Sequence, residues 1–306
     1  MKVIKLYILF LLAFPYFLFS QPEKADFKLV SPKQVIPFSH YKYIRVLDIR
    51  HDTTNIGFVI TKGLNNTALV IPETSLQDQI QNFLYFCADS SENGELLLQI
   101  RKMKFVQRPK TIDEEGYFLF RANLFSKEND SYKKIKGIDT LLIVPTMKDK
   151  NELQVEASSL ITNFILANIS QIHLVKESKS YFEVLKADSI EKSKLKAYCI
   201  GEYTNGVYTN YTSFKNQTPD YVPAKIVFRK NNIKRIKKIN SEGKKTNADV
   251  KDIYAVIDKG KIYISAEFGY YTLFKFNYDF QCFGVGEVPH TNAEILLAGI
   301  VGGATG

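Results

Sequence analysis

Tryptophan is absent from the 306 residues, and methionine, cysteine and histidine are scarce, with three, three and four residues respectively. The four histidines, His40, His51, His173 and His290, are scattered and show no spacing typical of a metal site. The motifs of P-loop NTPases, serine hydrolases, zinc proteases and dithiol oxidoreductases are also missing. We therefore expect no metal and no cofactor, and the sequence favours no enzyme class.

The three cysteines, Cys87, Cys199 and Cys282, exclude a disulfide framework, because they allow at most one disulfide. Cys87 falls on the apolar side of a predicted helix, where a thiol behaves as a small hydrophobic group. Cys199 and Cys282 fall in stretches that resemble strands. Sequence spacing does not fix their geometry, so their pairing stays open.

A long apolar run, Leu6 to Phe19, follows the cations Lys2 and Lys5 at the start of the chain. This pattern predicts a signal peptide over residues 1–20 and export to the periplasm or the outer membrane. The run is short for a bilayer span, which needs about 20 apolar residues. A retained N-terminal anchor is the alternative, because Leu18 is not the small residue that a cleavage site prefers.

The length of the chain leaves room for about two further domains, and 45% of the residues are hydrophobic. We expect an N-terminal arm over residues 21–40, an α+β domain over 41–177, and a smaller β-rich domain over 181–288. Residues 289–306 form an apolar, glycine-rich tail that either docks on the protein or meets a membrane.

The first domain opens with two predicted strands, Ile44 to Ile49 and Ile56 to Ile60, which are joined by the polar turn Arg50 to Asn55. Thr74 and Gln77 match a capping box, so a helix should follow. Its apolar face recurs at helical spacing and consists of Leu76, Ile80, Phe83, Leu84 and Cys87.

Three longer strands are expected next: Glu95 to Gln107 with a bulge near Arg101, Tyr117 to Phe125, and Ile138 to Val144. An apolar stripe over residues 151–175 predicts a second helix. The fold class is therefore α+β, with two helices on one face of a mostly antiparallel sheet.

The second domain should contain a strand from Leu195 to Glu202 and a meander of short strands after Asp252. Asp258 to Gly260 forms one of the predicted hairpin turns in this meander. We expect a small antiparallel sheet or a partial barrel.

Two segments carry a resemblance to known proteins: Arg45 to Arg50 with Asp52 to Gly57, and Gly206 to Tyr208 with Phe214 to Pro219. With them the chain resembles a family of uncharacterised exported proteins of Bacteroidetes-type bacteria, and this resemblance implies no activity. The element order over roughly residues 40–175 is similar to that of transport-auxiliary lipoproteins of the Gram-negative envelope.

A cluster of charged and polar residues, Asp48, His51 and Asp52, is the best candidate for catalysis. A carboxylate beside an imidazole can bind a metal or move protons. The alternative is an exposed hairpin end with an ion pair of little energetic value.

Basic residues form the clearest electrostatic feature of a chain whose formal net charge is +9. We predict that Lys234, Arg235, Lys237 and Lys238 bind an anionic glycan or lipid surface of the envelope. An exported protein rarely meets nucleic acid, so that ligand is not expected. The alternative is a solvated hairpin without a ligand.

The sequence thus favours a non-enzymatic module that binds or assembles something in the cell envelope, with an envelope protein as a further candidate partner. The competing hypothesis is an enzyme that acts on envelope glycan or lipid. Seven tyrosines of the second domain could also form a sugar-stacking platform, although strand and core positions are their commoner use. They are Tyr198, Tyr203, Tyr208, Tyr211, Tyr263, Tyr270 and Tyr271.

Overall fold

The computed structural model describes residues 23–30, 39–50, 52–60, 67–88, 93–108, 115–145, 151–170, 177–229, 232–249, 252–266, 269–276 and 279–282. The predicted signal peptide, His51, His173 and the apolar tail lie outside these residues. None of the helices in the described ranges combines the length and the apolar character needed to cross a bilayer.

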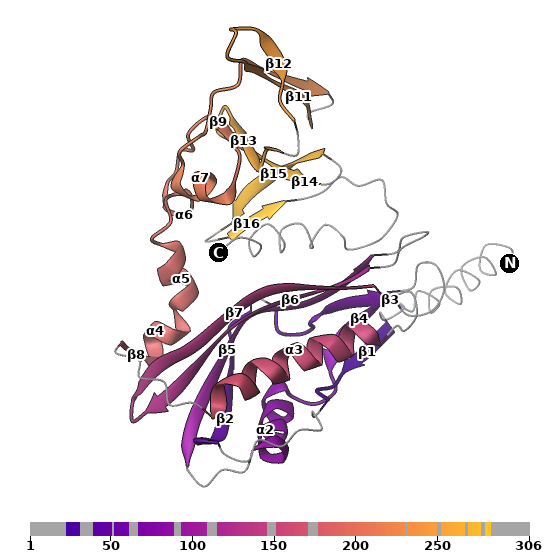
Figure 1. Ribbon diagram of the computed structural model, residues 1–306, viewed down its shortest axis with the longest axis vertical. Coiled ribbons are helices and arrows are strands. Elements are labelled where there is room, and N and C mark those ends of the chain that lie inside the picture. The colour runs from indigo at the N-terminus through magenta and orange to yellow at the C-terminus, as the bar shows by residue number, and fades with distance from the viewer. Residues whose placement is uncertain are drawn as a thin grey trace, which may run out of the picture.

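Runs of strands are separated by the two long helices in the first half of the chain, and short helices precede the mainly β-structured remainder (Figure 1). In chain order they are β1 (Glu23–Phe27), β2 (Tyr41–Asp48), β3 (Gly57–Ile60), β4 (Thr67–Pro72), α2 (Leu76–Cys87), β5 (Gly94–Arg108), β6 (Glu115–Glu128), β7 (Ser131–Pro145), α3 (Glu152–Ile169), β8 (Ser178–Ser180), α4 (Tyr181–Leu185), α5 (Ala187–Lys192), α6 (Lys196–Cys199), β9 (Gly206–Tyr208), α7 (Tyr211–Asn216), β10 (Lys225–Arg229), β11 (Asn232–Ile239), β12 (Lys245–Asn247), β13 (Ala255–Asp258), β14 (Lys261–Ala266), β15 (Gly269–Phe276) and β16 (Asp279–Cys282).

The N-terminal half is built on an eight-stranded sheet with the order β1-β4-β3-β5-β6-β7-β8, and β2 pairs with β5. One side of β5 pairs with β6. Its other side pairs first with β2, from Gly94 to Ile100, and then with β3, at Phe105 and Val106. The pairs β1·β4, β2·β5 and β3·β5 are parallel, and the others are antiparallel. The predicted α+β class is confirmed, and β1 lies within the segment expected to be an arm.

The predicted bulge is also confirmed, because the pairing of β5 with β6 skips Arg101 between Ile100 and Lys102. This extra residue reverses the alternation of inward and outward side chains. Leu98 and Ile100 are therefore buried on the same face of the sheet as Met103.

Both large helices pack on one face of this sheet, and Figure 1 shows α3 and α2 below β5, β6 and β7. The inward residues of β6 are at most 1% exposed, as their alternation predicted; they are Phe118, Phe120, Ala122 and Leu124. Burying one such large apolar side chain stabilises the fold by about 1.5–3 kcal/mol. This layer therefore holds the domain together.

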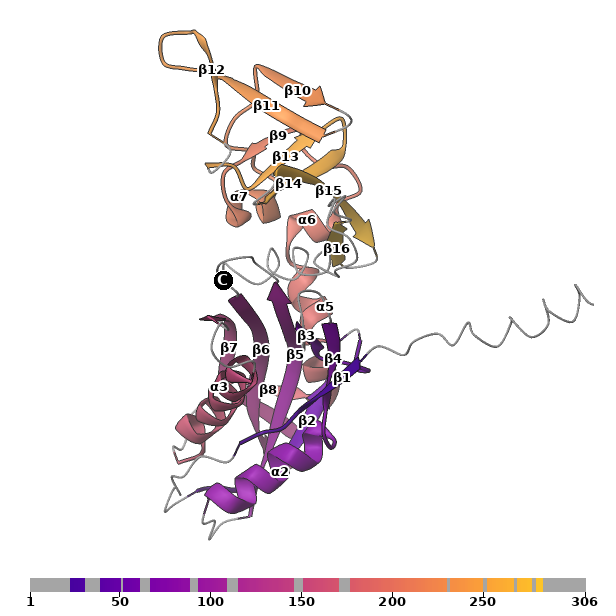
Figure 2. The same ribbon diagram turned by 90° about the vertical axis from the view of Figure 1, so that its right-hand side faces the viewer.

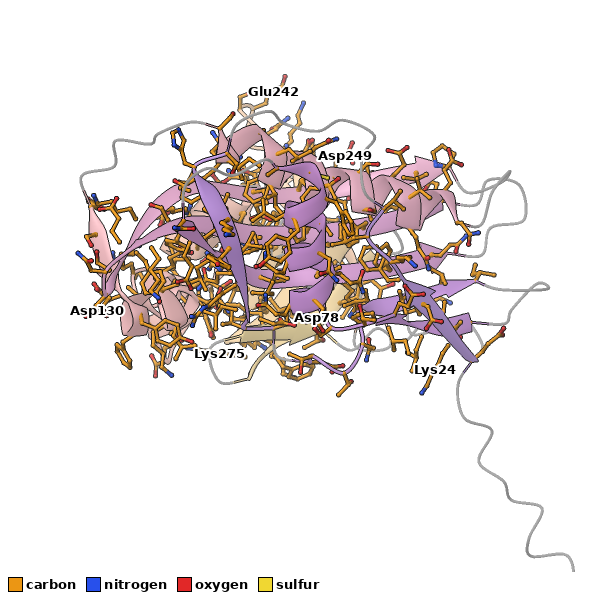
Figure 3. The ribbon with its side chains drawn as sticks, turned by 90° about the horizontal axis from the view of Figure 1, so that it is seen from below. Lys24, Asp78, Asp130, Glu242, Asp249 and Lys275 are labelled. Atoms are coloured by element: carbon orange, nitrogen blue, oxygen red, sulfur yellow. The ribbon has the colours of Figure 1, made fainter. Side chains whose placement is uncertain are left out.

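The cap of α2 differs from the predicted one. Ser75, not Thr74, is the N-cap, and its hydroxyl accepts a hydrogen bond from the Asp78 backbone nitrogen at 3.0 Å. Asp78, which Figure 3 labels in the first turn of α2, accepts from the same hydroxyl at 2.6 Å. Gln77 is thereby free to bond elsewhere, and it does so on β2.

The C-terminal half contains a five-stranded sheet, β16-β15-β14-β13-β9, and a three-stranded sheet, β10-β11-β12. The predicted hairpin turn joins β13 to β14, with positive φ at Lys259 (51°) and Gly260 (75°), as a tight turn of this hand requires. The strand expected from Leu195 to Glu202 is wrong. One helical turn, α6, replaces it and buries Ala197 against the core, and lysine and alanine suit this conformation.

Candidate functional site

Asp48 and Arg50 form a tight ion pair at the end of β2. The Arg50 Nη2 lies 2.7 Å from the Asp48 Oδ2, and the Arg50 side chain is only 7% exposed. The remaining guanidinium nitrogen, Nη1, donates to the carbonyl oxygens of Asn55 at 2.9 Å and Met103 at 3.5 Å. Both charged groups are thus occupied within the fold.

The position of Arg50 explains its contacts. The Ile49 nitrogen still donates to Ile100 on β5, and the Phe105 nitrogen of β5 donates to Ile56. Between these two points no described strand pairs with the side of β5 that faces away from β6, and the Arg50 guanidinium takes the place of a strand as hydrogen-bond donor. We conclude that Arg50 closes a gap in the sheet between β2 and β3.

Asp52 closes the adjoining loop. Its carboxylate accepts hydrogen bonds from the Thr54 nitrogen at 2.9 Å, the Thr54 hydroxyl at 2.6 Å and the Asn55 amide at 2.9 Å. These bonds, first of all the one from the Thr54 hydroxyl, lower the pKa of Asp52. A carboxylate used in this way supports a turn. The structure thus shows Asp48 and Asp52 in structural roles. His51 lies outside the described residues, so its part in the predicted cluster stays a prediction.

The four predicted basic ligands, Lys234, Arg235, Lys237 and Lys238, all belong to β11, but they do not share one surface. Arg235 and Lys237 pair with Val227 and Lys225 of β10, on the outer face of the three-stranded sheet. Lys238 pairs with Thr246 and alternates to the opposite face, which packs through Ile236 on the core. Lys234 is the extra residue of a β-bulge.

The outer face instead gains cations from the neighbouring strands. We call it the basic face and define it by Lys225, Arg229, Arg235, Lys237 and Lys245. All of them are exposed except Lys237, which is half-buried. Strand alternation across the predicted hairpin could have found this set, because every second residue shares a face.

Within the described residues, the basic face has no counterion. None of its five cations forms an ion pair or a side-chain hydrogen bond within the described part of the chain, and the three strands contain no Asp or Glu. The nearby Glu242 bonds to Lys244 at 3.2 Å. Lys225 and Lys237 lie directly opposite each other, and such a like-charge pair opposes folding. The positive charge is therefore left available to a ligand.

The tyrosines of the second half belong mainly to the core. Tyr208, Tyr263 and Tyr270 are at most 6% exposed, and burial raises the pKa of Tyr208 and of Tyr270 to about 12. The others named above pack partly buried on the same core, such as Tyr198 against Phe280 with ring centroids 5.0 Å apart. The platform hypothesis is not supported, because few ring faces are free.

A second charged cluster escaped the sequence analysis. Arg101 on β5 lies 2.6 Å from Asp188 and 2.7 Å from Glu191, both on α5, and its side chain is 6% exposed. Burial alone would raise the pKa of Asp188, but hydrogen bonds from Lys192 and Arg101 outweigh it and lower this pKa to about 2. No local pattern could reveal this cluster, because 87 positions separate Arg101 from Asp188. It clamps α5 onto the outer side of the large sheet.

Metal chemistry finds no support in the described ranges, where no group of three or more His, Cys, Asp or Glu residues is arranged to hold an ion. Cys199 is a free, exposed thiol, and Cys87 is buried, as its helical position predicted. The side chain of Cys282 lies outside the described residues, so the question of its pairing with Cys199 stays open.

No family model matches the chain, and no curated protein matches it. Among solved structures, an uncharacterised protein is similar at 11% identity and a TM-score of 0.28, covering 48% of this chain and 95% of its own. A Xanthomonas campestris protein of family DUF330 is similar at 5% identity and a TM-score of 0.32, covering 46% and 92%. These similarities concern uncharacterised proteins and are too low to carry a functional argument. The resemblance to exported proteins of Bacteroidetes-type bacteria remains a prediction.

Proposed function

We propose that this protein is a non-enzymatic binding or assembly module of the cell envelope, and that its basic face holds an anionic lipid or glycan surface. The observation that carries the proposal is the pair Lys225 and Lys237, placed opposite each other on a face with three further cations. A like-charge pair costs stability in the free protein. An anionic ligand would offset that cost.

The shape of the basic face supports an extended ligand. Opposite residues of paired strands lie about 5 Å apart, and alternate residues along a strand about 7 Å apart. Such a grid faces several closely spaced anionic groups at once, whereas a small molecule needs a concave pocket. Val227 and Ile239 lie on the same face, and Ile239 is 61% exposed. Apolar groups among cations suit the boundary of a lipid layer.

The place of action follows from the signal-peptide pattern in residues 1–20, which directs the chain to the periplasm or the outer membrane. Anionic lipids, lipopolysaccharide and acidic glycans are the polyanions of that compartment, and nucleic acid is not. A protein partner for assembly belongs to the same proposal.

The competing hypothesis, an enzyme acting on envelope glycan or lipid, has less support. It needs Asp48, His51 and Asp52 to share a pocket. Asp48 is held by Arg50, and Asp52 is held by Thr54 and Asn55. Within the described residues, both carboxylates are therefore used by the fold itself.

The proposal is tested by binding of the full chain to three probes: phosphatidylcholine vesicles, vesicles that also contain phosphatidylglycerol, and soluble heparin. We expect binding to the anionic vesicles and to heparin that weakens as salt is added, because exposed charges are screened. Binding to the anionic vesicles but not to heparin would identify a lipid surface as the ligand. Stronger binding to heparin than to the vesicles would identify a glycan.

Two neighbouring residues provide a matched pair of variants. Lys237→Glu changes the basic face, and Lys238→Glu makes the same charge change on the opposite side of the strand. Each cation near an anionic surface contributes about 1 kcal/mol, so Lys237→Glu should weaken binding at least tenfold and Lys238→Glu far less. Equal losses would show that only net charge matters, and they would contradict a defined face.

A further inference from the structure

The edges of the eight-stranded sheet differ in whether their backbone groups are already hydrogen-bonded. At the β2 edge they are bonded to side chains of α2. Gln77 of α2 accepts from the Val46 nitrogen at 2.7 Å and donates to the Ile44 carbonyl at 2.9 Å. One turn later, Gln81 accepts from the Ile44 nitrogen at 2.9 Å and donates to the Lys42 carbonyl at 3.2 Å. These two side chains copy the hydrogen bonds of a neighbouring strand, so another strand cannot add there.

The margin at β1 is protected in another way. The strand is short and carries Glu23, Lys24 and Asp26, and charged residues discourage strand addition. The chain beyond it is bonded to both helices, because the Leu29 nitrogen donates to Gln79 at 2.8 Å and the Val30 nitrogen to Ser158 at 2.7 Å.

The margin at β7 is left open. β8 pairs only with Ser131 to Lys133, and no other described strand pairs with this side of β7. We call the remaining backbone, from Lys134 to Pro145, the β7 edge; Figure 2 shows β7 at the outer margin of the sheet. Asp139 is the one acidic residue there, and Arg121 of β6 pairs with it at 3.0 Å. The edge also carries Lys134 and Lys136, but from Thr140 to Val144 it is uncharged and mainly apolar. An uncharged apolar stretch of this kind is a template for strand addition.

The core is incomplete along the same margin. Most apolar residues between sheet and helices are buried, whereas Ile138 and Leu142 of β7, and Leu160 and Leu166 of α3, are only partly covered. Ile143, on the other face of the strand, is 54% exposed. A strand added to the β7 edge would cover these apolar groups while pairing the free backbone.

We propose that the β7 edge accepts an extended segment of a second protein by antiparallel strand addition, in line with β8. The segment would carry branched apolar residues opposite Ile138, Thr140 and Leu142, and a carboxylate opposite the exposed Lys136. This is β-augmentation, in which backbone bonds give affinity and alternate side chains give specificity.

A second copy of this chain fits the edge less well. If two β7 strands paired antiparallel with their helix-facing sides matched, Lys136 of one strand would lie opposite a residue on the same face of the other. That face of β7 carries no acidic residue. The sole carboxylate, Asp139, alternates to the other face and is already paired with Arg121. Charge complementarity therefore favours a different protein.

The test uses the full chain and a short synthetic peptide of alternating valine and threonine with one glutamate in the register of Lys136. Binding is followed by fluorescence anisotropy, and amide hydrogen exchange locates the contact. We expect slower exchange at Ile138 to Val144, which reports new backbone bonds. A control peptide with alternate backbone amides methylated cannot form those bonds and should not bind.

A charge exchange makes the test specific. The exposed Lys136 tolerates substitution, so Lys136→Glu should weaken binding of the glutamate peptide roughly threefold to tenfold and favour a lysine peptide instead. Unchanged exchange at the edge, equal binding of the methylated peptide, or self-association of the chain through the same amides would each overturn the proposal. Binding to anionic vesicles is measured separately, so failure here does not touch the basic face.

Discussion

Two charged regions of this protein look similar in the sequence and differ in the structure. They are the basic face and the group that we call the Arg50 cluster, which consists of Asp48, Arg50, Asp52, Thr54, Asn55 and Gly57. In the Arg50 cluster, the Arg50 side chain is buried, and its guanidinium donates to the Asp48 carboxylate and to the carbonyl oxygens of Asn55 and Met103. On the basic face the cations face solvent, and Lys225 stands opposite Lys237. The first arrangement stabilises the fold and the second weakens it.

The difference teaches that the partner of a charge, rather than its presence, indicates function. A buried and paired cation has no bond left for a ligand. An unpaired group of cations on one strand face has its full electrostatic potential available. The two segments on which the predicted family resemblance rests also have polar groups bonded within the chain. The Gly57 nitrogen donates to Asn55, and Gln217 accepts from the Thr204 nitrogen and donates to the Phe214 carbonyl.

The largest effect is expected at Gly57, which ends the Arg50 cluster. Its φ is +108°, and a Cβ there would lie 2.0 Å from the Phe105 carbonyl oxygen. Gly57→Ala should cost several kcal/mol or prevent folding. Gly243, in the turn beside the basic face, has φ of +73° and open space, so Gly243→Ala should cost only about 1–2 kcal/mol. Urea unfolding measures both, and equal losses would contradict the distinction.

Arg50 itself should come next. Arg50→Ala removes the guanidinium donors of Asp48, which keeps only the bond from the Arg50 backbone nitrogen, and it also removes the donor to the Asn55 and Met103 carbonyls. Breaking a buried pair costs about 3 kcal/mol. Arg235→Ala on the basic face removes no ion pair or side-chain hydrogen bond of the described residues and should stay within about 0.5 kcal/mol. Chemical denaturation of the two variants provides the comparison. A similar small loss in both would mean that Arg50 does not close the sheet.

A third charged group, in which Arg101 pairs with Asp188 and Glu191, should make stability depend on pH. The pKa of Asp188 is lowered from 3.8 to about 2 in the folded protein, so its contribution to stability is present above 3.8 and is lost as the pH falls toward 2. Asp188→Asn should therefore flatten the pH dependence of the melting temperature in this window. An unchanged slope would show that other carboxylates cause the acid unfolding.

The smallest effect has the opposite sign. Lys237→Glu places an acid opposite Lys225 and should raise the free energy of unfolding by roughly 0.2–1 kcal/mol, although it weakens anion binding. Lys238→Glu faces Thr246 and should bring no such gain. Thermal melting and vesicle-binding curves of both variants show whether stability rises while anion binding falls. A variant that loses both stability and binding would indicate that Lys237 supports the fold.

Much of the fold could be predicted because its periodicity is local. Alternation along β6, the apolar stripes of α2 and α3 and the turn at Lys259 and Gly260 each appear within a few residues. Where several short-range preferences compete, the prediction was wrong. Leu195 to Glu202 contains enough branched and aromatic residues for a strand, but contact with α7 favours a helical turn.

The sequence by itself determined the element types, the α+β class and the concentration of positive charge between Lys225 and Lys245, since these depend on neighbours along the chain. Only the tertiary structure decided which charges were already paired. Arg101 pairs with Asp188, 87 positions away, and Arg50 bonds to the Met103 carbonyl at the gap between β2 and β3. Gln77, which was predicted to cap α2, bonds instead to the backbone of β2. Hydrogen bonds and ion pairs act over a few ångströms in space, so their partners become known only when distant segments are placed side by side.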